Sequence, residues 1–138
     1  MGDSWRVIAS RGFRWDGVEL ERYKSDPSLF DGVTRQVLLG GAGEEALALE
    51  LRYFEVEPGG YTTLERHRHP HAVIVLRGRG SAVLGSDSHR IQSHDCVYIP
   101  PELVHQFRAD CGETLGFVCV VDRVRDRARP VPTDRPEM

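Results

Sequence analysis

The stretch "LERHRHPHAVIVLRG", from Leu64 to Gly78, places polar side chains directly before an apolar strand. Alternate side chains of an extended chain share one face, so the face that carries Val73 and Val75 also carries the polar residues before them. These residues are Glu65, His67, His69 and His71. Burying such groups without partners costs about 1–3 kcal/mol for each of them. A bound metal ion removes that penalty, so the stretch predicts a metal site beside a buried strand.

Pro70 interrupts this alternation. Proline cannot donate to a strand ladder, and it biases the preceding residue away from the helical region. We therefore expect a reversal around His69 and Pro70, with Glu65 and His67 ending one strand and His71 opening the next. His69 is then expected in the turn, facing solvent or lying behind the metal ligands.

The rest of the chain predicts an all-β protein. Short apolar or alternating runs are separated by turn residues, and a helical period is not sustained beyond the N-terminal third. About eight short strands at this spacing are typical of a sandwich or barrel. The expected strands are 34–39, 46–56, 72–76, 80–84, 89–91, 96–99, 106–108 and 115–121, with breaks at Gly40-Gly41, Pro58-Gly59-Gly60, Gly78, Gly85-Ser86-Asp87, Pro100-Pro101 and Asp110-Cys111-Gly112.

Length and composition indicate one globular domain. The chain has 138 residues, 40% of them hydrophobic, and a formal net charge of −3. That charge gives no attraction to nucleic acid or to an anionic membrane, so we expect a small-molecule partner. A signal peptide or membrane span is not recognisable, which predicts a cytoplasmic protein. Three cysteines without CxxC spacing predict reduced, mostly buried thiols.

Two flanking segments are less regular than the centre. Residues 1–33 contain turn signals around Asp26-Pro27 and Asp31-Gly32, and we treat them as an N-terminal extension. Residues 122–138 alternate in charge and contain three prolines. We expect this C-terminal tail to be solvated or loosely packed.

The two polar clusters of the central region resemble the two sequence motifs of the cupins. The first cupin motif is glycine, five residues, His-x-His, three or four residues, Glu, six residues and glycine. It is matched from Gly59 to Gly78 in spacing, with Glu65, His67 and His71 at the ligand positions. The second motif is glycine, five residues, Pro-x-Gly, two residues, His, three residues and Asn. The segment from His94 to Ala109 is similar to it, with Pro100, Glu102 and His105 in register.

This resemblance implies a cupin β-barrel, a double-stranded β-helix or jelly roll, over residues 34–121. It also implies one divalent transition metal ion (Fe, Mn, Ni, Cu or Zn), because such N/O donor sets suit these ions. The ligand set that it suggests is Glu65, His67, His71 and His105. The carboxylate then stands first instead of third. A shift by two residues would give His67, His69 and His105 instead. The resemblance and the open strand edges together predict a homodimer.

Two classes of function fit these expectations. The first is a metal-dependent enzyme, most plausibly dioxygenase-like, that acts on a small organic substrate; isomerases and lyases of similar size belong to the same class. The second is a cupin that binds or senses a small ligand or metal without turnover. Fold analogy does not separate the two.

Overall fold

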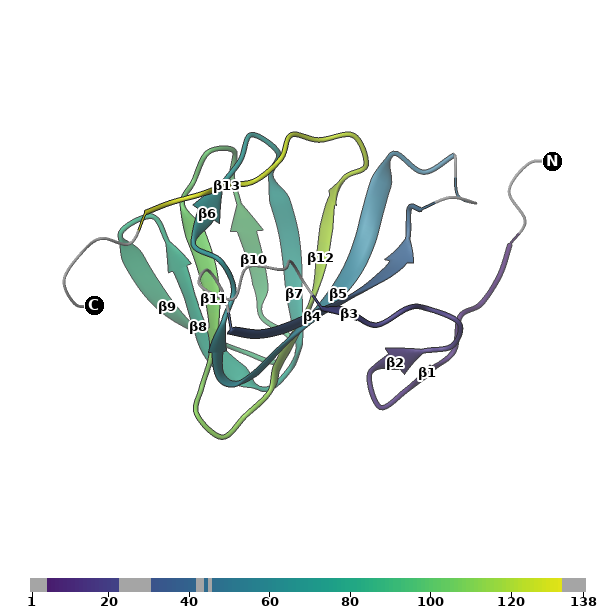
Figure 1. The fold of residues 1–138 in the computed structure, drawn as a ribbon, viewed down its shortest axis with the longest axis horizontal. Coiled ribbons are helices and arrows are strands. Elements are labelled where there is room, and N and C mark those ends of the chain that lie inside the picture. The colour runs from purple at the N-terminus through teal and green to yellow at the C-terminus, as the bar shows by residue number, and fades with distance from the viewer. Residues whose placement is uncertain (1–4, 23–30, 42–43, 45, 133–138) are drawn as a thin grey trace.

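The computed structural model describes residues 5–22, 31–41, 44 and 46–132. Its ordered elements are all strands, which confirms the all-β prediction. No helix in this part of the chain is long and apolar enough to cross a membrane. Figure 1 shows the strands curling into a half-open barrel, with a small hairpin standing apart from it.

The strands follow the chain from β1 to β13. Their bounds are β1 Ser10–Arg11, β2 Arg14–Trp15, β3 Glu21–Arg22, β4 Asp31–Leu39, β5 Leu49–Tyr61, β6 Glu65–Arg66, β7 His71–Arg77, β8 Arg79–Leu84, β9 Asp87–Gln92, β10 Cys96–Ile99, β11 His105–Ala109, β12 Leu115–Asp122 and β13 Arg129–Pro130.

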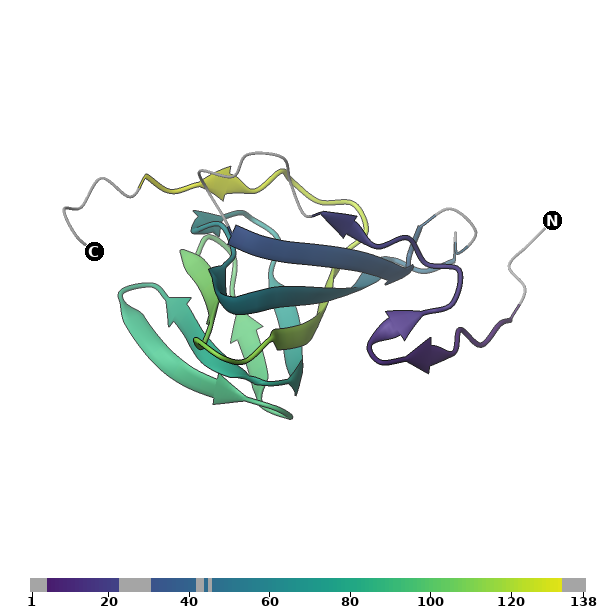
Figure 2. The same ribbon diagram turned by 60° about the horizontal axis from the view of Figure 1, so that its bottom comes forward.

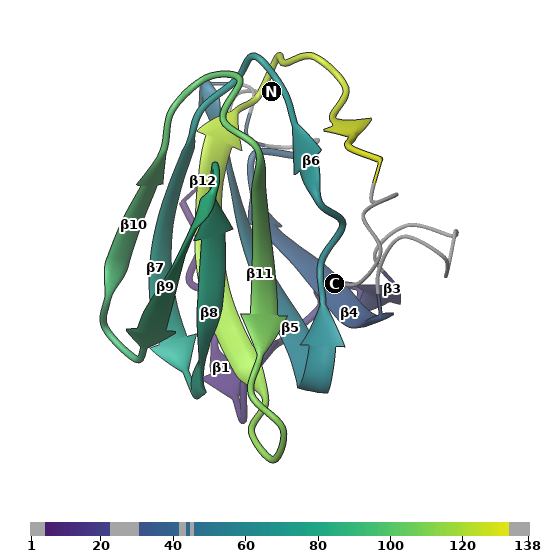
Figure 3. The ribbon, with the colours of Figure 1, turned by 90° about the vertical axis from the view of Figure 1, so that its left-hand side faces the viewer.

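Strand pairing divides the barrel into two curved layers. One layer has the order β10-β7-β12-β5, with β4 and then β3 beside β5. The other consists of β9, β8, β11, β6 and β13, paired in that order. The layers join where Tyr61 of β5 pairs with Arg108 of β11. Figure 3 shows β8, β11 and β6 side by side across this second layer.

The core lies between the two layers, where β-branched and aromatic side chains point inward. Alternate residues of β12 are buried, so Phe117 stacks on Phe54 at a ring-centroid distance of 5.5 Å and contacts Phe107 at 4.5 Å. Val73 and Val75 of β7 are buried in the same core. The alternation predicted for this strand is therefore present.

Strand β5 passes through the Pro58-Gly59-Gly60 break that the sequence predicted. Gly59 adopts a φ of 77°, which bends the strand without ending it. The N–H of Gly59 donates to the carbonyl of Asp110 at 3.0 Å. The turn residues thus become a kink, and this kink moves one strand from the first layer to the second.

In the second cupin-like motif, two residues other than glycine adopt the positive φ angles that usually require glycine. His94 and Glu102 occupy the two glycine positions of that motif, and their φ angles are 79° and 67°. Left-handed conformations are uncommon outside glycine, so both positions are strained. Gly78 of the first motif is required for a different reason. A Cβ there would collide with the carbonyl oxygen of Thr114.

The N-terminal hairpin β1–β2 extends away from the barrel in Figures 1 and 2. Gln36 of β4 ties it down, accepting from the N–H of Trp15 at 3.2 Å and donating to the carbonyl of Phe13 at 3.0 Å. The predicted N-terminal extension, residues 1–33, lies partly outside the described residues, and the turn at Asp26-Pro27 falls there. Strand β4 begins at Asp31, three residues before the predicted start.

The C-terminal segment does not follow the expectation of a solvated tail. Residues 123–132 run across one end of the barrel, and β13 pairs with β6 (Figure 2). Arg123 anchors the segment by donating to the carbonyls of Glu44 and Leu47. Arg123, Arg125 and Asp126 of this segment all make hydrogen bonds or ion pairs with the barrel.

The cysteine prediction was wrong in one respect. Cys96 and Cys111 are exposed, and only Cys119 of the three is buried. Cys96 lies in a strand, but on its outward face. The apolar run around it indicated a strand, and the side of that strand was misjudged.

Candidate metal centre

Three of the four predicted ligands, Glu65, His67 and His105, lie in one cluster, and the fourth, His71, lies in a second cluster with His67 and His69. Glu65 lies in β6, where its partner across the ladder is His105, the first residue of β11. The chain leaves β6 after Arg66, bends, and enters β7 at His71. His67 lies in this bend and is 2% exposed. Ligand atoms of Glu65, His67 and His105 all lie within 4.8 Å of one another.

Each imidazole is oriented through its Nδ1 atom. The Nδ1 of His67 donates to the carbonyl of His69 at 2.6 Å, and the Nδ1 of His105 donates to the carbonyl of Leu103 at 2.9 Å. A carbonyl oxygen can only accept, so both rings carry their hydrogen on Nδ1. In the neutral ring, the lone pair is then on Nε2, which is the arrangement that metal-binding histidines use.

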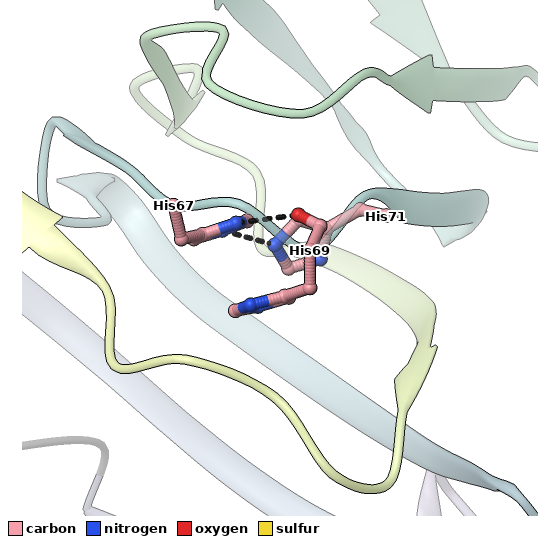
Figure 4. Close-up of side chains that lie close together, drawn as sticks. All are labelled: His67, His69 and His71. Carbon is pink, nitrogen blue, oxygen red and sulfur yellow. Dashed lines mark hydrogen bonds between the residues drawn. The ribbon is translucent and has the colours of Figure 1, made fainter.

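His71 meets His67 directly (Figure 4). Their Nε2 atoms lie 2.7 Å apart, and the Nδ1 of His71 lies 2.6 Å from the Sγ of Cys119. The lone pair on Nε2 of His67 accepts a proton carried by Nε2 of His71 in the neutral pair. A cation bound by both atoms would displace this hydrogen from Nε2 of His71, which would then carry it on Nδ1, beside the Sγ of Cys119.

His69 belongs to the cluster by distance but is poorly placed to share an ion with His67. Its ring is parallel to that of His67, with an interplanar angle of 4° and a centroid distance of 3.6 Å. A metal lies close to the plane of each imidazole that binds it, at roughly 2.1 Å from the nitrogen. One ion cannot satisfy two parallel planes at this spacing. The rings of His71 and His105 are tilted by 52° and 70° from that of His67, and their planes cross it.

Asp126 fixes His69 in this position. Its carboxylate accepts from the Nδ1 of His69 at 2.8 Å and from the backbone N–H groups of Arg68 and His69. The backbone N–H of Arg68 is the main cause that lowers the pKa of Asp126, followed by the hydrogen bond from His69. His69 is buried, so it does not face solvent. The sequence analysis missed Asp126, which lies 57 residues from His69 in the segment that was expected to be solvated.

Burial favours the neutral form of two imidazoles of the cluster, those of His67 and His71. Burial lowers the pKa of His67 to about 4, helped by the neighbouring His69 and His105. Burial also lowers the pKa of His71, to which His105, His67 and Arg52 contribute. Neutral imidazole is the form that binds metal. A donor set of one carboxylate and three imidazoles fits a divalent transition metal.

Cys119 lies behind His71, on the side away from the other histidines. Its Sγ lies 2.6 Å from the Nδ1 of His71 and accepts from the Nη2 of Arg52 at 3.3 Å. Burial raises the pKa of this thiol, and Arg52 acts in the opposite direction. The thiol thus connects a metal-binding imidazole to a buried guanidinium.

A cavity of about 860 Å³ opens beside the cluster. Its lining comprises the imidazoles of the bend, residues of β4 and β5, and the C-terminal segment that follows β12. The lining residues are Arg35, Glu50, Arg52, Glu65, His67, His69, His71, Arg123, Arg125, Asp126, Arg127, Ala128 and Pro130. The volume lies in the range typical of small-molecule sites.

Comparison with known proteins identifies relatives over most of the chain. Residues 52–121 match the family model described as a cupin domain. The chain is 50% identical to a 1-methylthio-D-xylulose 5-phosphate methylsulfurylase of Rhodospirillum rubrum, over 88% of this chain and 76% of that protein.

Solved structures of two relatives support the same assignment. A cupin-2 domain protein of Rhodospirillum rubrum is 48% identical, with a TM-score of 0.80 over 94% of this chain and 84% of that one. A cupin 2 conserved barrel protein of Rhodopseudomonas palustris is 45% identical, with a TM-score of 0.82 over 95% of this chain and 88% of that one. These matches confirm the predicted fold.

Proposed function

Because this chain belongs to the cupin family, we propose that it is a metal-dependent enzyme that removes the methylthio group from a small ketose phosphate. The observation that carries the proposal is its 50% identity, over 88% of its length, to an enzyme named for 1-methylthio-D-xylulose 5-phosphate. The geometry supports it, since one cavity joins a metal-binding cluster to a group of arginines. The arginines can hold the phosphate group, and a metal ion can act on the carbonyl of the sugar.

Glu65, His67, His71 and His105 would hold the metal. The bound ion would supply a Lewis acid for the carbonyl oxygen next to the methylthio-bearing carbon. Removal of this group from that carbon needs a nucleophile that accepts the sulfur, and a small thiol is the simplest one. Its sulfur forms an S–S bond to the methylthio sulfur as the C–S bond breaks. The electron pair of that bond moves toward the carbonyl, and the carbon takes up a proton.

The acceptor thiol comes from solution in this proposal. Cys119 is buried behind His71 and is not among the residues that line the cavity. Cys96 and Cys111 are exposed elsewhere on the surface. The protein's own part is to orient the imidazoles, to hold the anionic end of the substrate and to limit the access of water to the reacting carbon.

Turnover is the direct test. The protein, loaded in turn with Fe, Mn, Ni, Cu or Zn, is mixed with 1-methylthio-D-xylulose 5-phosphate and a small thiol. We expect the S-methyl proton resonance of the substrate to be replaced by that of a mixed methyl disulfide, together with a 1-deoxy ketose phosphate. His67→Ala should abolish the reaction. Failure of every metal form to consume the substrate would refute the proposal.

The dioxygenase considered first in the sequence analysis is less well supported, because the named relative is a methylsulfurylase. A dioxygen electrode in the same assay separates the two reactions. Consumption of dioxygen without disulfide formation would favour an oxygenase. Binding without either reaction would favour the binding or sensing module.

The homodimer remains a proposal. Trp5 and Val7 near the N-terminus are 90% and 86% exposed, and apolar side chains of this kind are candidates for burial between subunits. Sedimentation at micromolar concentration should give twice the chain mass. A clean monomer would refute it.

A further inference from the structure

The cavity beside the metal cluster is positively charged, although the chain as a whole carries −3. Five arginines and three carboxylates line it. Once Glu65 serves a metal ion, the excess of positive charge on the remaining lining grows. Such a cavity favours an anionic ligand.

Arg52 is the buried member of this group, with a side chain only 6% exposed. Its Nη2 donates to the thiol of Cys119, whereas its buried Nε has no hydrogen-bond partner. The nearest carboxylate oxygen, Oε1 of Glu50, lies 3.5 Å from this Nε and already accepts from Arg125 at 2.8 Å. One carboxylate thus faces two guanidiniums. A buried donor without a hydrogen bond is unfavourable, and an anionic oxygen would satisfy it.

The other arginines of the lining divide into two kinds. Arg123 and Arg125 use their N–H groups on backbone carbonyls of the barrel and of their own segment, and Arg35 is paired with Glu21. Arg127 is exposed at the cavity and makes no hydrogen bond or ion pair with any residue of the described part of the chain. Arg127 can therefore turn toward a ligand without breaking a contact.

We propose that Arg52 and Arg127 form a subsite for the phosphate of the substrate, beside the histidine cluster. This rests on the proposed function for the identity of the phosphate ester, while the anion site itself rests on the geometry. Guanidinium forks match phosphate oxygens in pairs of hydrogen bonds. Arg52 provides a fixed donor at the wall, and Arg127 closes on the phosphate from the C-terminal segment. The thiol of Cys119 links Arg52 to His71, so the subsite is a near neighbour of the ligand atoms.

Calorimetric titration of the metal-loaded protein tests the subsite without turnover. The probes are D-xylulose 5-phosphate and D-xylulose. The parent protein should bind the phosphate ester at least tenfold more tightly than the free sugar. Arg52→Gln should lose this preference while its affinity for D-xylulose and its metal content stay unchanged. Arg127→Gln should reduce the preference for the phosphate ester a few-fold. Arg79→Gln removes an equal charge outside the cavity and should bind as the parent does.

Inorganic phosphate distinguishes an anion held by the arginines from one held by the metal. In protein freed of metal, phosphate should still bind, and Arg52→Gln should abolish that binding. Loss of phosphate binding on removal of the metal would overturn the proposal. Unchanged affinity for D-xylulose 5-phosphate in Arg52→Gln would do so too. If that buried variant does not fold, an unchanged Arg127→Gln decides against the subsite in the same way.

The two proposals fail separately. A protein that binds the ketose phosphate through Arg52 but leaves the methylthio compound unreacted would refute the proposed reaction and keep the subsite. Turnover with an unchanged KM in both arginine variants would refute the subsite and keep the reaction.

Discussion

The cavity has two walls of different character. The imidazole wall consists of Glu65, His67, His69 and His71, and the arginine wall consists of Arg35, Arg52, Arg123, Arg125 and Arg127. Burial lowers the pKa values of His67 and His71, so these two imidazoles offer lone pairs. The guanidiniums keep their charge at any physiological pH and offer only donors. One wall is suited to a cation and the other to an anion.

One cavity can thus favour a cation at one wall and an anion at the neighbouring wall. Removal from water neutralises a histidine but leaves an arginine charged, because their ordinary pKa values lie on opposite sides of pH 7 by very different margins. Cys119 lies between the walls, in contact with His71 and Arg52. It separates the two kinds of group without adding a fixed charge while it stays a thiol.

The largest effect should come from removing a metal ligand of the imidazole wall. Glu65→Ala should lower metal occupancy at least tenfold, because it removes the one carboxylate of the donor set. His69→Ala should retain nearly the parent occupancy, since its ring stacks on that of His67 and does not share a metal with it. Elemental analysis after reconstitution measures both.

His67→Ala serves as the positive control for complete loss, and His89→Ala, on the exposed strand β9, as the control for no loss. The reverse pattern, with His69→Ala losing metal and Glu65→Ala retaining it, would make His69 a ligand. The metal ligands would then be His67, His69 and His105.

A smaller effect is expected at the junction of the walls, where Asp126 holds His69. Asp126→Asn keeps the size of the side chain but removes the charge that accepts three N–H groups. We expect amide exchange in residues 66–70 and 123–132 to speed up several-fold. Metal affinity should fall less than tenfold, because Asp126 contacts no proposed ligand directly. Asp87→Asn, on the exposed strand β9, is the matched control. Unchanged amide exchange in Asp126→Asn would show that other contacts hold residues 123–132 on the barrel.

The smallest effect concerns acidity. His67 has a pKa of about 4 in the folded chain, below the value near 6.5 of an exposed histidine. Between these values the unfolded chain binds a proton that the folded chain does not, so stability falls as the pH falls. The thermal midpoint of the metal-free protein should therefore decrease from pH 6.5 to 4, and it should go on decreasing below pH 4 because the pKa values of His71 and Asp126 are lowered as well. His67→Gln should flatten this dependence. A midpoint that rises on acidification would contradict a neutral imidazole wall.

Most of the barrel could be predicted from sequence because its signals are local. The alternation of Val73 and Val75 with exposed neighbours, and the spacing from Gly59 to Gly78, indicated strands and their register. The break at Gly59 was read as a turn, since a turn and a strand kink need the same positive φ. Only the pairing of Tyr61 with β11 distinguishes them, and that pairing is a long-range contact.

The two walls also differ in how far local sequence signals could predict them. Four polar side chains of the imidazole wall lie within seven residues, and the pattern there predicted that three of them, Glu65, His67 and His71, converge. The arginine wall is assembled from β4, β5 and the segment after β12, which are far apart in the sequence. Asp126 was missed for this reason. An acidic residue among alternating charges has no local feature that marks it as the partner of a histidine.

The segment after β12 forms much of the arginine wall yet adds nothing to the hydrophobic core, whose last residue in the described chain is Val121. The part of the cavity lining that this segment supplies is therefore separate from the hydrophobic core. Exchanges at Arg127 or Ala128 would alter what the cavity accepts while leaving the packing between the layers intact. A barrel organised in this way can acquire a new substrate by changing its tail, and the same division offers the protein engineer a place to begin.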